Sequence, residues 1–389
     1  MSIVDELYSE IDNGREGRNL GLKTGLPKLD WYTGGFQKGV YKLIFGQSGS
    51  GKSSYVIYSD LYRILRDYPD RDIVHVYFSL EMSSKVLLAK LLNLYIYDTY
   101  GIEISYMTLM SVREKLSDKY QASVMPINCA ELSIEDKYIQ ESRVWLNSII
   151  HKLIIFDKQL SSNTFYGNMK ELLKQWGTFQ DIDEGRRNIY IPSNPDKIIN
   201  VIIDHAGLLT PVDGRTKKQE IDQTSQYCVY FREKCGISID FIMQENRNTS
   251  DVNRLKMDLA EPTLDDVKDS GNAGNDCNIC VAVYNPIKHQ RSTYRGYTII
   301  NKEYPEESLG SAIRGLILLK HRFGVANKVF CTGFQGSLGR FEELPDPGSI
   351  NYEVYQSWKD EKLEDEITKD TAAKDAEEKD SLQKPIFKF

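Results

Sequence analysis

The sequence predicts an α/β protein with a central, mostly parallel, twisted sheet flanked by helices. From about Leu20 to Glu343, short apolar runs alternate with longer segments of helical periodicity, which is the pattern of strand–helix–strand units. Several of these runs end in polar residues, and open α/β sheets bind ligands at that carboxyl edge. The first run also leads directly into a glycine-rich segment of the kind that binds phosphate. These observations place a ligand site at one edge of the sheet.

The apolar runs mark the expected strands of the main domain. Residues 19–345 are expected to form this domain, with an inserted loop or hairpin at 177–197, where Gly185, Pro192 and Pro195 interrupt the alternation. Strands are expected at Val40–Phe45, Ile73–Ser79, Leu153–Phe156, Ile198–Ile203, Ile239–Gln244, Ile279–Tyr284 and Gly315–Lys320.

The two ends of the chain are expected to lie outside the main domain. Residues 1–18 are expected to form an amphipathic linker helix, because Ile3, Leu7 and Ile11 share one stripe. This helix packs either on its own domain or on a neighbouring subunit, and the sequence favours neither. Residues 346–389 are expected to form an acidic, flexible tail, whose apolar tip either docks on another protein or frays.

Composition narrows the class of protein. Hydrophobic residues make up 41% of the chain, which allows a sizeable core, yet no apolar run is long enough to cross a bilayer. The first residues lack the form of a signal peptide, so a cytoplasmic location and no membrane partner are expected. The net charge of −7 argues against a protein that coats DNA over its outside, although a narrow basic channel is compatible with it. A CxxC at Cys277 and Cys280 lacks a second ligand pair and is expected to be structural.

The glycine-rich segment fits the pattern G-x-x-x-x-G-K-[ST] at each fixed position, with a strand expected before it and a helix after it. Its glycines allow successive backbone N–H groups to point at one anion. Lys52 would neutralise the β- and γ-phosphates, and the Ser53 hydroxyl would join the Mg²⁺ shell. The expected cofactors are therefore ATP and Mg²⁺. The expected nucleotide-binding residues are Gly46, Gln47, Ser48, Gly49, Ser50, Gly51, Lys52, Ser53 and Ser54.

Two carboxylates complete the predicted site. Asp204 ends the run Ile198–Ile203, where it would face the phosphates and hold Mg²⁺. Glu81 follows the run Ile73–Ser79, from which a carboxylate can orient and deprotonate the water that attacks the γ-phosphate. The alternatives are a strand-end cap for Asp204 and an ordinary exposed side chain for Glu81. Their combination with the glycine-rich segment favours the catalytic interpretation.

The segments around these residues also form a recognisable series. They include Ser79-Leu80-Glu81-Met82, the lead-in Thr24–Gly39, and Met243-Gln244-Glu245-Asn246-Arg247, followed by Pro262–Gly271 and Leu319–Gly324. In this order, along most of the chain, they resemble the DnaB-type replicative DNA helicases, whose catalytic glutamate lies in a segment similar to the first. The resemblance implies a RecA-like P-loop ATPase core and ATP-driven unwinding of DNA.

The resemblance implies further site residues. Gln244 would sense the γ-phosphate, while Lys320 and Arg322 would reach across a subunit boundary to a neighbour's ATP. Arginine is planar and always charged, which suits a clamp on the γ-phosphate in the transition state. A site completed in trans implies a homo-oligomer, expected to be a hexameric ring that moves 5′-to-3′ on single-stranded DNA. Without the resemblance, Lys320 and Arg322 would be ordinary strand-end cations.

Contacts with single-stranded DNA are expected from two polar loops that face the channel of the ring. A few cations per subunit suffice for phosphate binding when several subunits contribute. Ordinary surface cations are the alternative at each position. The loop after Gln244 is preferred over the one after Asp204, which carries Arg215, Lys217 and Lys218. The preferred candidates are Arg247, Asn248, Arg254 and Lys256.

The sequence also departs from the family pattern. His205 and Gly207 stand where the family has Tyr and Gln, and Met243 stands where it has Ser. We also expect no N-terminal primase-binding domain before the core. These differences indicate a divergent member, such as a viral one acting in the host cytoplasm. They leave open whether unwinding is retained. The alternatives are a RecA/RadA-type recombination or repair ATPase and an ATP-binding assembly protein with little turnover.

Overall fold

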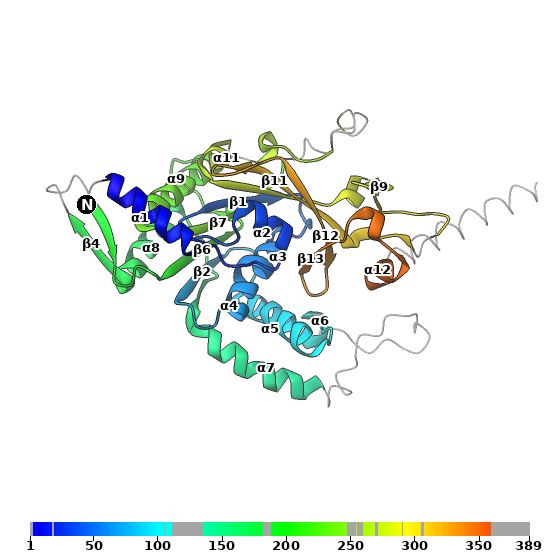
Figure 1. Cartoon of the computed structure of the whole chain (residues 1–389). Helices are drawn as coiled ribbons and strands as arrows, with labels where there is room; N and C mark the ends of the chain where they lie inside the picture. Colours follow the sequence, from blue (N-terminus) through cyan, green and yellow to red (C-terminus); the bar gives the residue numbers. More distant parts are fainter. Residues whose placement is uncertain are drawn as a thin grey trace, which may run out of the picture.

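The computed structural model describes residues 3–17, 19–104, 106–110, 135–181, 188–246, 254, 260–268, 271–289, 291–304 and 307–358. Its centre is a nine-stranded sheet with the strand order β13-β12-β11-β8-β1-β7-β6-β2-β3 (Figure 1). The strands are β1 Tyr41–Gly46, β2 Ile73–Ser79, β3 Leu153–Phe156, β6 Ile198–Asp204, β7 Ser238–Gln244, β8 Ile279–Tyr284, β11 Ile313–His321, β12 Lys328–Gln335 and β13 Arg340–Glu343.

The sheet is mostly parallel, as the sequence predicts. The adjacent strands β8, β1, β7, β6, β2 and β3 run parallel to one another. On the other side of β8, the strands β11, β12 and β13 continue the sheet in antiparallel pairing. No apolar run of the sequence predicts β12 and β13. Both carry polar residues and are only partly buried, because they lie at the edge of the sheet and lack the unbroken apolar run of a central strand.

Helices cover both faces of the sheet and enclose a core on each. On one face, α8 (Ser162–Trp176) and α9 (Lys217–Cys235) pack over strand residues such as Leu43. On the other face, the core around Ile44 includes α3 (Lys52–Val56), η1 (Ile57–Tyr62) and α5 (Ser84–Tyr100). Neighbouring residues of β1 thus enter opposite cores, which is why the central strands are apolar on both sides.

The remaining elements surround this three-layer centre (Figure 1). Strands β4 (Gly177–Asp181) and β5 (Asn188–Pro192) form an antiparallel hairpin. The apolar side chains of α1 are exposed, with Ile3 at 82% and Leu7 at 58%. Within the described ranges, no helix has the length and apolar character needed to cross a membrane. The other elements are α1 Ile3–Arg15, α2 Pro27–Thr33, α4 Arg63–Asp67, α6 Tyr106–Leu109, α7 Glu135–Ile149, η4 Ile150–Lys152, η5 Ala206–Leu208, η7 Leu264–Asp266, α11 Gly271–Asp276, η8 Pro286–His289, β9 Thr293–Tyr294, β10 Tyr297–Thr298, η10 Gly310–Ala312, η11 Pro347–Ser349 and α12 Tyr352–Ser357.

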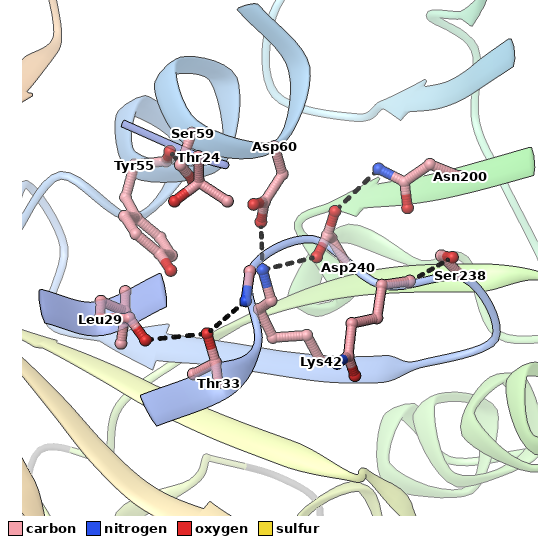
Figure 2. Close-up of polar contacts among 12 residues, drawn as sticks. Thr24, Leu29, Thr33, Lys42, Tyr55, Ser59, Asp60, Asn200, Ser238 and Asp240 are labelled. Carbon is pink, nitrogen blue, oxygen red and sulfur yellow. Dashed lines mark hydrogen bonds and ion pairs between the residues drawn. The ribbon is translucent and has the colours of Figure 1, made fainter. Parts of the chain in front are cut away.

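A buried group of charges lies near the amino ends of the central strands (Figure 2). The Nζ of Lys42 on β1 lies 2.6 Å from Asp60 Oδ2 and 3.8 Å from Asp240 Oδ1. Asn200 on β6 donates to the other oxygen of Asp240 at 2.9 Å. Burial alone would lower the pKa of Lys42, but attraction by Asp60, Tyr55 and Asp240 outweighs it and raises the pKa. The group joins η1, which directly follows α3, to β1, β6 and β7.

Candidate functional site

The glycine-rich loop connects the end of β1 to the start of α3. Gly51 has φ +101° and Gly49 has φ +70°, in the left-handed region that side chains other than glycine rarely adopt. A Cβ on Gly46 would lie 2.4 Å from the carbonyl oxygen of Val283. The loop therefore requires glycine at these positions, and it delivers its N–H groups to the amino end of α3, where anions bind favourably.

Lys52, the first residue of α3, is a buried cation above this loop. Its Nζ donates to the carbonyl oxygen of Gln47 at 2.8 Å. Burial lowers the pKa of Lys52 to about 8, against the attraction of Asp204, Glu81 and Glu245. The ammonium group is desolvated before any ligand arrives, so the negative charge of a phosphate group would favour its charged form.

Ser53 and Asp204 form the part of the site that fits a metal ion. Ser53 Oγ donates to Asp204 Oδ1 at 2.8 Å, while Tyr77 OH donates to Asp204 Oδ2 at 2.6 Å. Burial raises the pKa of Asp204, while the hydrogen bonds from Tyr77 and Ser53 oppose that rise. A hydroxyl beside a carboxylate oxygen is the hard oxygen donor set that Mg²⁺ prefers. The residues present therefore fit the expected ion.

Glu81 lies beside this group on an anchored turn after β2. The backbone N–H of Leu80 donates to the carbonyl oxygen of Asp204 at 2.8 Å, and Ser79 Oγ donates to the carbonyl oxygen of Met82 at 2.6 Å. The Glu81 side chain is exposed and interacts electrostatically with Lys52. The predicted role of Glu81, to orient the water that attacks a nucleotide's terminal phosphate, stays a prediction.

Gln244 joins the same edge from β7. It pairs in register with Gly46, and its Nε2 lies 3.4 Å from Nε2 of His205. Burial lowers the pKa of His205, which favours a neutral ring that can accept a hydrogen bond from the Gln244 amide. The structure thus brings Lys52, Ser53, Asp204, Glu81 and Gln244 together at the carboxyl edge of four neighbouring strands.

Lys320 and Arg322 lie at the opposite edge of the sheet from the chain's own P-loop. Lys320 on β11 is opposite Cys280, near the amino end of β8, and that end pairs with the amino end of β1. The Nζ of Lys320 donates to the carbonyl oxygens of Gly274 and Asn275, at 2.8 and 2.7 Å. Arg322 Nη2 donates to the Asn275 carbonyl oxygen at 3.1 Å. Within one chain, neither cation is part of the nucleotide site.

The predicted DNA contacts fall only partly on the described residues. Arg247, Asn248 and Lys256 lie outside them. The guanidinium of Arg254 donates to both carboxylate oxygens of Asp266, at 2.6 and 2.8 Å. A DNA phosphate would have to compete with this carboxylate, and a role for Arg254 in binding DNA stays a prediction.

The two cysteines of the CxxC lie in the core of the sheet domain. Cys277 and Cys280 are buried, and neither forms a disulfide. In the part of the chain that the structure describes, no group of three or more His, Cys, Asp or Glu side chains could hold a metal ion.

Several residues near the site were not identified in the sequence. Arg314 Nε donates to the carbonyl oxygen of Ser50 at 2.8 Å, and Lys288 Nζ donates to that of Ser48, so both brace the glycine-rich loop. Lys90 on α5 has its pKa lowered by burial, against the attraction of Asp204 and Glu81. Tyr77 contacts Asp204 directly. None of these residues had a sequence signal, because each acts through a contact with a distant segment.

The chain has a RecA-like fold, and the loop between β1 and α3 carries the P-loop sequence pattern. Residues 21–162 match the family model of the DnaB-like helicase C-terminal domain. A solved structure described as an ATPase domain is similar, with a TM-score of 0.61 and 20% identity, covering 88% of this chain and 99% of that chain. A second, described as a DnaB-like replicative helicase and its interactions with primase, has a TM-score of 0.57 and 20% identity, covering 88% of this chain and 68% of that chain. A comparison with curated proteins finds no match.

The match over residues 21–162 agrees with the resemblance that the motifs indicate, and the structural similarity confirms the RecA-like fold. The matched range includes the P-loop and Glu81. Asp204, Gln244, Lys320 and Arg322 lie beyond it, so their roles depend on motif order and on geometry. For Asp204 and Gln244, the geometry places both side chains beside the P-loop.

Proposed function

We propose that this chain is the motor of a replicative DNA helicase that hydrolyses ATP and moves 5′-to-3′ on single-stranded DNA as a homo-hexameric ring. The observation that supports it best is the convergence of Lys52, Ser53, Asp204, Glu81 and Gln244 at one sheet edge, in a chain whose residues 21–162 match the DnaB-like helicase C-terminal domain. Such a motor would act on DNA in the cytoplasm, which is the location expected from the sequence.

Each residue has a distinct task in the proposed hydrolysis. The loop N–H groups and Lys52 hold the β- and γ-phosphates. Mg²⁺, when bound with ATP, would neutralise phosphate charge, and Ser53 and Asp204 would hold it. Glu81 orients the attacking water and accepts its proton. Gln244 contacts the γ-phosphate and passes its presence to the loop that follows β7, which carries the candidate DNA contacts Arg247, Asn248, Arg254 and Lys256.

The position of Lys320 and Arg322 supports a site shared between subunits. Both lie away from the chain's own P-loop, and their head groups reach only backbone carbonyl oxygens at 2.7 to 3.1 Å among the described contacts. In a head-to-tail ring, the partly buried end of β11 and the exposed Arg322 after it can face the next subunit's nucleotide. Arg322 would then stabilise charge on the γ-phosphate in the transition state. The exposed apolar stripe of α1 would dock on a neighbouring subunit. The C-terminal tail would dock on another replication protein.

The first experiment is ATP hydrolysis by the full-length protein with and without single-stranded DNA, together with unwinding of a forked duplex. We expect DNA to stimulate hydrolysis and the fork to be unwound from its 5′ tail, with Lys52→Ala inactive because nucleotide binding is weakened. If the protein instead formed filaments on DNA, and DNA stimulated its hydrolysis without any unwinding of the fork, a RecA/RadA-type ATPase would be indicated. Slow ATP hydrolysis whose rate does not change when DNA is added would indicate an assembly protein.

Arg322→Ala is expected to lower turnover by about 100-fold, because the transition state loses one preorganised charge. The same protein should still bind nucleotide. Mixing it with Glu81→Gln, which is inactive for a different reason, should restore activity wherever the first supplies Glu81 and the second supplies Arg322. Phosphate release by the two proteins, separate and mixed, measures this.

Arg143→Ala, which removes an exposed arginine of α7, is the matched control and should hydrolyse ATP normally. If Arg322→Ala retained full turnover, the role in trans would be excluded. A mixture that stayed inactive would show that the two residues do not act on one shared site.

A further inference from the structure

We infer that Tyr77 is the positioning residue of the metal-binding carboxylate: its hydroxyl holds Asp204 in the orientation that leaves one carboxylate oxygen for Ser53 and the metal ion. This inference rests on the proposed function, because it concerns the site of the metal–nucleotide complex. It assigns a role within the reaction to a residue from the interior of β2.

The sheet register places Tyr77 below the site. On neighbouring β2 and β6, Ser79 pairs with Asp204 and Tyr77 pairs with Ile202. Side chains alternate between the faces of a strand, so Tyr77 and Asp204 project from the same face, two positions apart. The phenol ring belongs to the apolar core that contains Ile44, and its hydroxyl reaches the carboxylate. The ring is long enough to connect the core to the site.

The environment of Asp204 makes this hydrogen bond consequential. Asp204 is 1% exposed and Tyr77 is 0% exposed, so bulk water cannot replace a lost donor. Oδ1 accepts from Ser53 at 2.8 Å, and Oδ2 accepts from Tyr77 at 2.6 Å. A buried carboxylate oxygen without a donor is costly, and the group would turn to find another partner. With Tyr77 in place, the two oxygens have separate tasks.

The expected size of the effect follows from general experience with metal sites. Residues that orient a metal-binding side chain, without touching the metal, change metal affinity by about 10- to 100-fold when they are removed. Tyr77→Phe removes only the hydroxyl and keeps the ring that packs in the core. The deficit should therefore appear in the metal requirement rather than in the fold.

The test is Mg²⁺-dependent binding of a fluorescent ATP analogue to the full-length protein. For Tyr77→Phe, we expect the Mg²⁺ concentration for half-maximal binding to rise by about 10-fold, while binding in EDTA stays as in the unaltered protein. Tyr62→Phe is the matched control. Its hydroxyl is also buried and donates to a carboxylate, Asp98, at 3.0 Å, outside the nucleotide site. It should leave the Mg²⁺ requirement unchanged. Asp204→Asn removes the proposed metal ligand itself and so sets the largest rise expected in the Mg²⁺ concentration for half-maximal binding.

The outcomes separate the inference from the proposed function. If the unaltered protein binds the analogue with a Mg²⁺ requirement that Tyr77→Phe does not change, Tyr77 has no positioning role. If Tyr77→Phe weakens binding equally in Mg²⁺ and in EDTA, the residue supports packing only, and the inference is again wrong. If the unaltered protein shows no Mg²⁺-dependent nucleotide binding, it is the proposed function that fails.

Discussion

Glu81→Gln is expected to lower ATP turnover by about 1,000-fold, because a general base contributes roughly 100- to 10,000-fold to a rate. Glutamine keeps the size and one acceptor oxygen of glutamate but cannot take up the proton of the attacking water. The segment around it should stay in place, since the backbone bond from Leu80 to Asp204 and the Ser79 bond to Met82 do not involve this side chain. Nucleotide binding should therefore be almost unchanged.

Phosphate release with and without single-stranded DNA measures the turnover, and a fluorescent nucleotide measures the binding. Glu171→Gln is the matched control, because Glu171 is exposed on α8 and pairs only with Lys174 among the described ion pairs. If Glu81→Gln kept most of the turnover, another carboxylate would have to be the base. Glu245 would be the next candidate, as a buried carboxylate that also interacts electrostatically with Lys52.

Lys42→Met is expected to destabilise the protein by about 3–5 kcal/mol, the usual cost of removing one partner from a buried ion pair. Lys42 is the cation shared by Asp60 and Asp240, whose side chains are 0% and 3% exposed (Figure 2). Methionine fills much of the same volume but leaves two buried carboxylates facing one another. The expected observation is a lower midpoint of urea denaturation, followed by circular dichroism.

The loss should grow as the pH rises. Burial, together with repulsion from Asp60, raises the pKa of Asp240 above its ordinary value of 3.8. The folded protein therefore keeps this proton in a range where the unfolded chain has released it, and stability falls as pH increases from about 4 through the raised pKa. Without Lys42, that pKa rises further. The difference from the unaltered protein should therefore be larger at pH 8 than at pH 5.

A second substitution separates charge from packing. Lys42→Met combined with Asp60→Asn removes the uncompensated pair and should recover much of the lost stability at pH 8, whereas a pure packing defect would persist. If Lys42→Met unfolded at the same urea concentration as the unaltered protein at pH 8, the buried charge group would contribute nothing to the fold.

The sequence predicts the parts of this protein that are set by local chemistry. The P-loop pattern requires glycine where Gly49 and Gly51 adopt positive φ and where Gly46 touches the β8 backbone, so the motif is visible without coordinates. The central strands are visible because they are buried on both faces and are therefore mostly apolar. Asp204 and Glu81 are predicted because one ends such a run and the other lies two residues after one.

Other features escaped the sequence because they depend on neighbours distant along the chain. Strands β12 and β13 are half-buried and contain polar residues, so their identity comes from pairing with β11. Lys42, Asp60 and Asp240 look like misplaced charges in the sequence and become a compensated group only when three elements meet. The supports of the site, Tyr77, Arg314 and Lys288, carry no motif, since each acts through a contact with a distant segment.

The sequence by itself therefore determined the class of fold, the phosphate-binding loop and the two carboxylates, because backbone conformation and strand burial dictate residue type position by position. Only the tertiary structure decided which groups meet. It aligned Ser53, Asp204 and Tyr77 through the register of parallel strands, and it placed Lys320 and Arg322 at the other edge, because β11 runs antiparallel to β8. The direction of a strand is a property of the whole sheet, and no short segment encodes it.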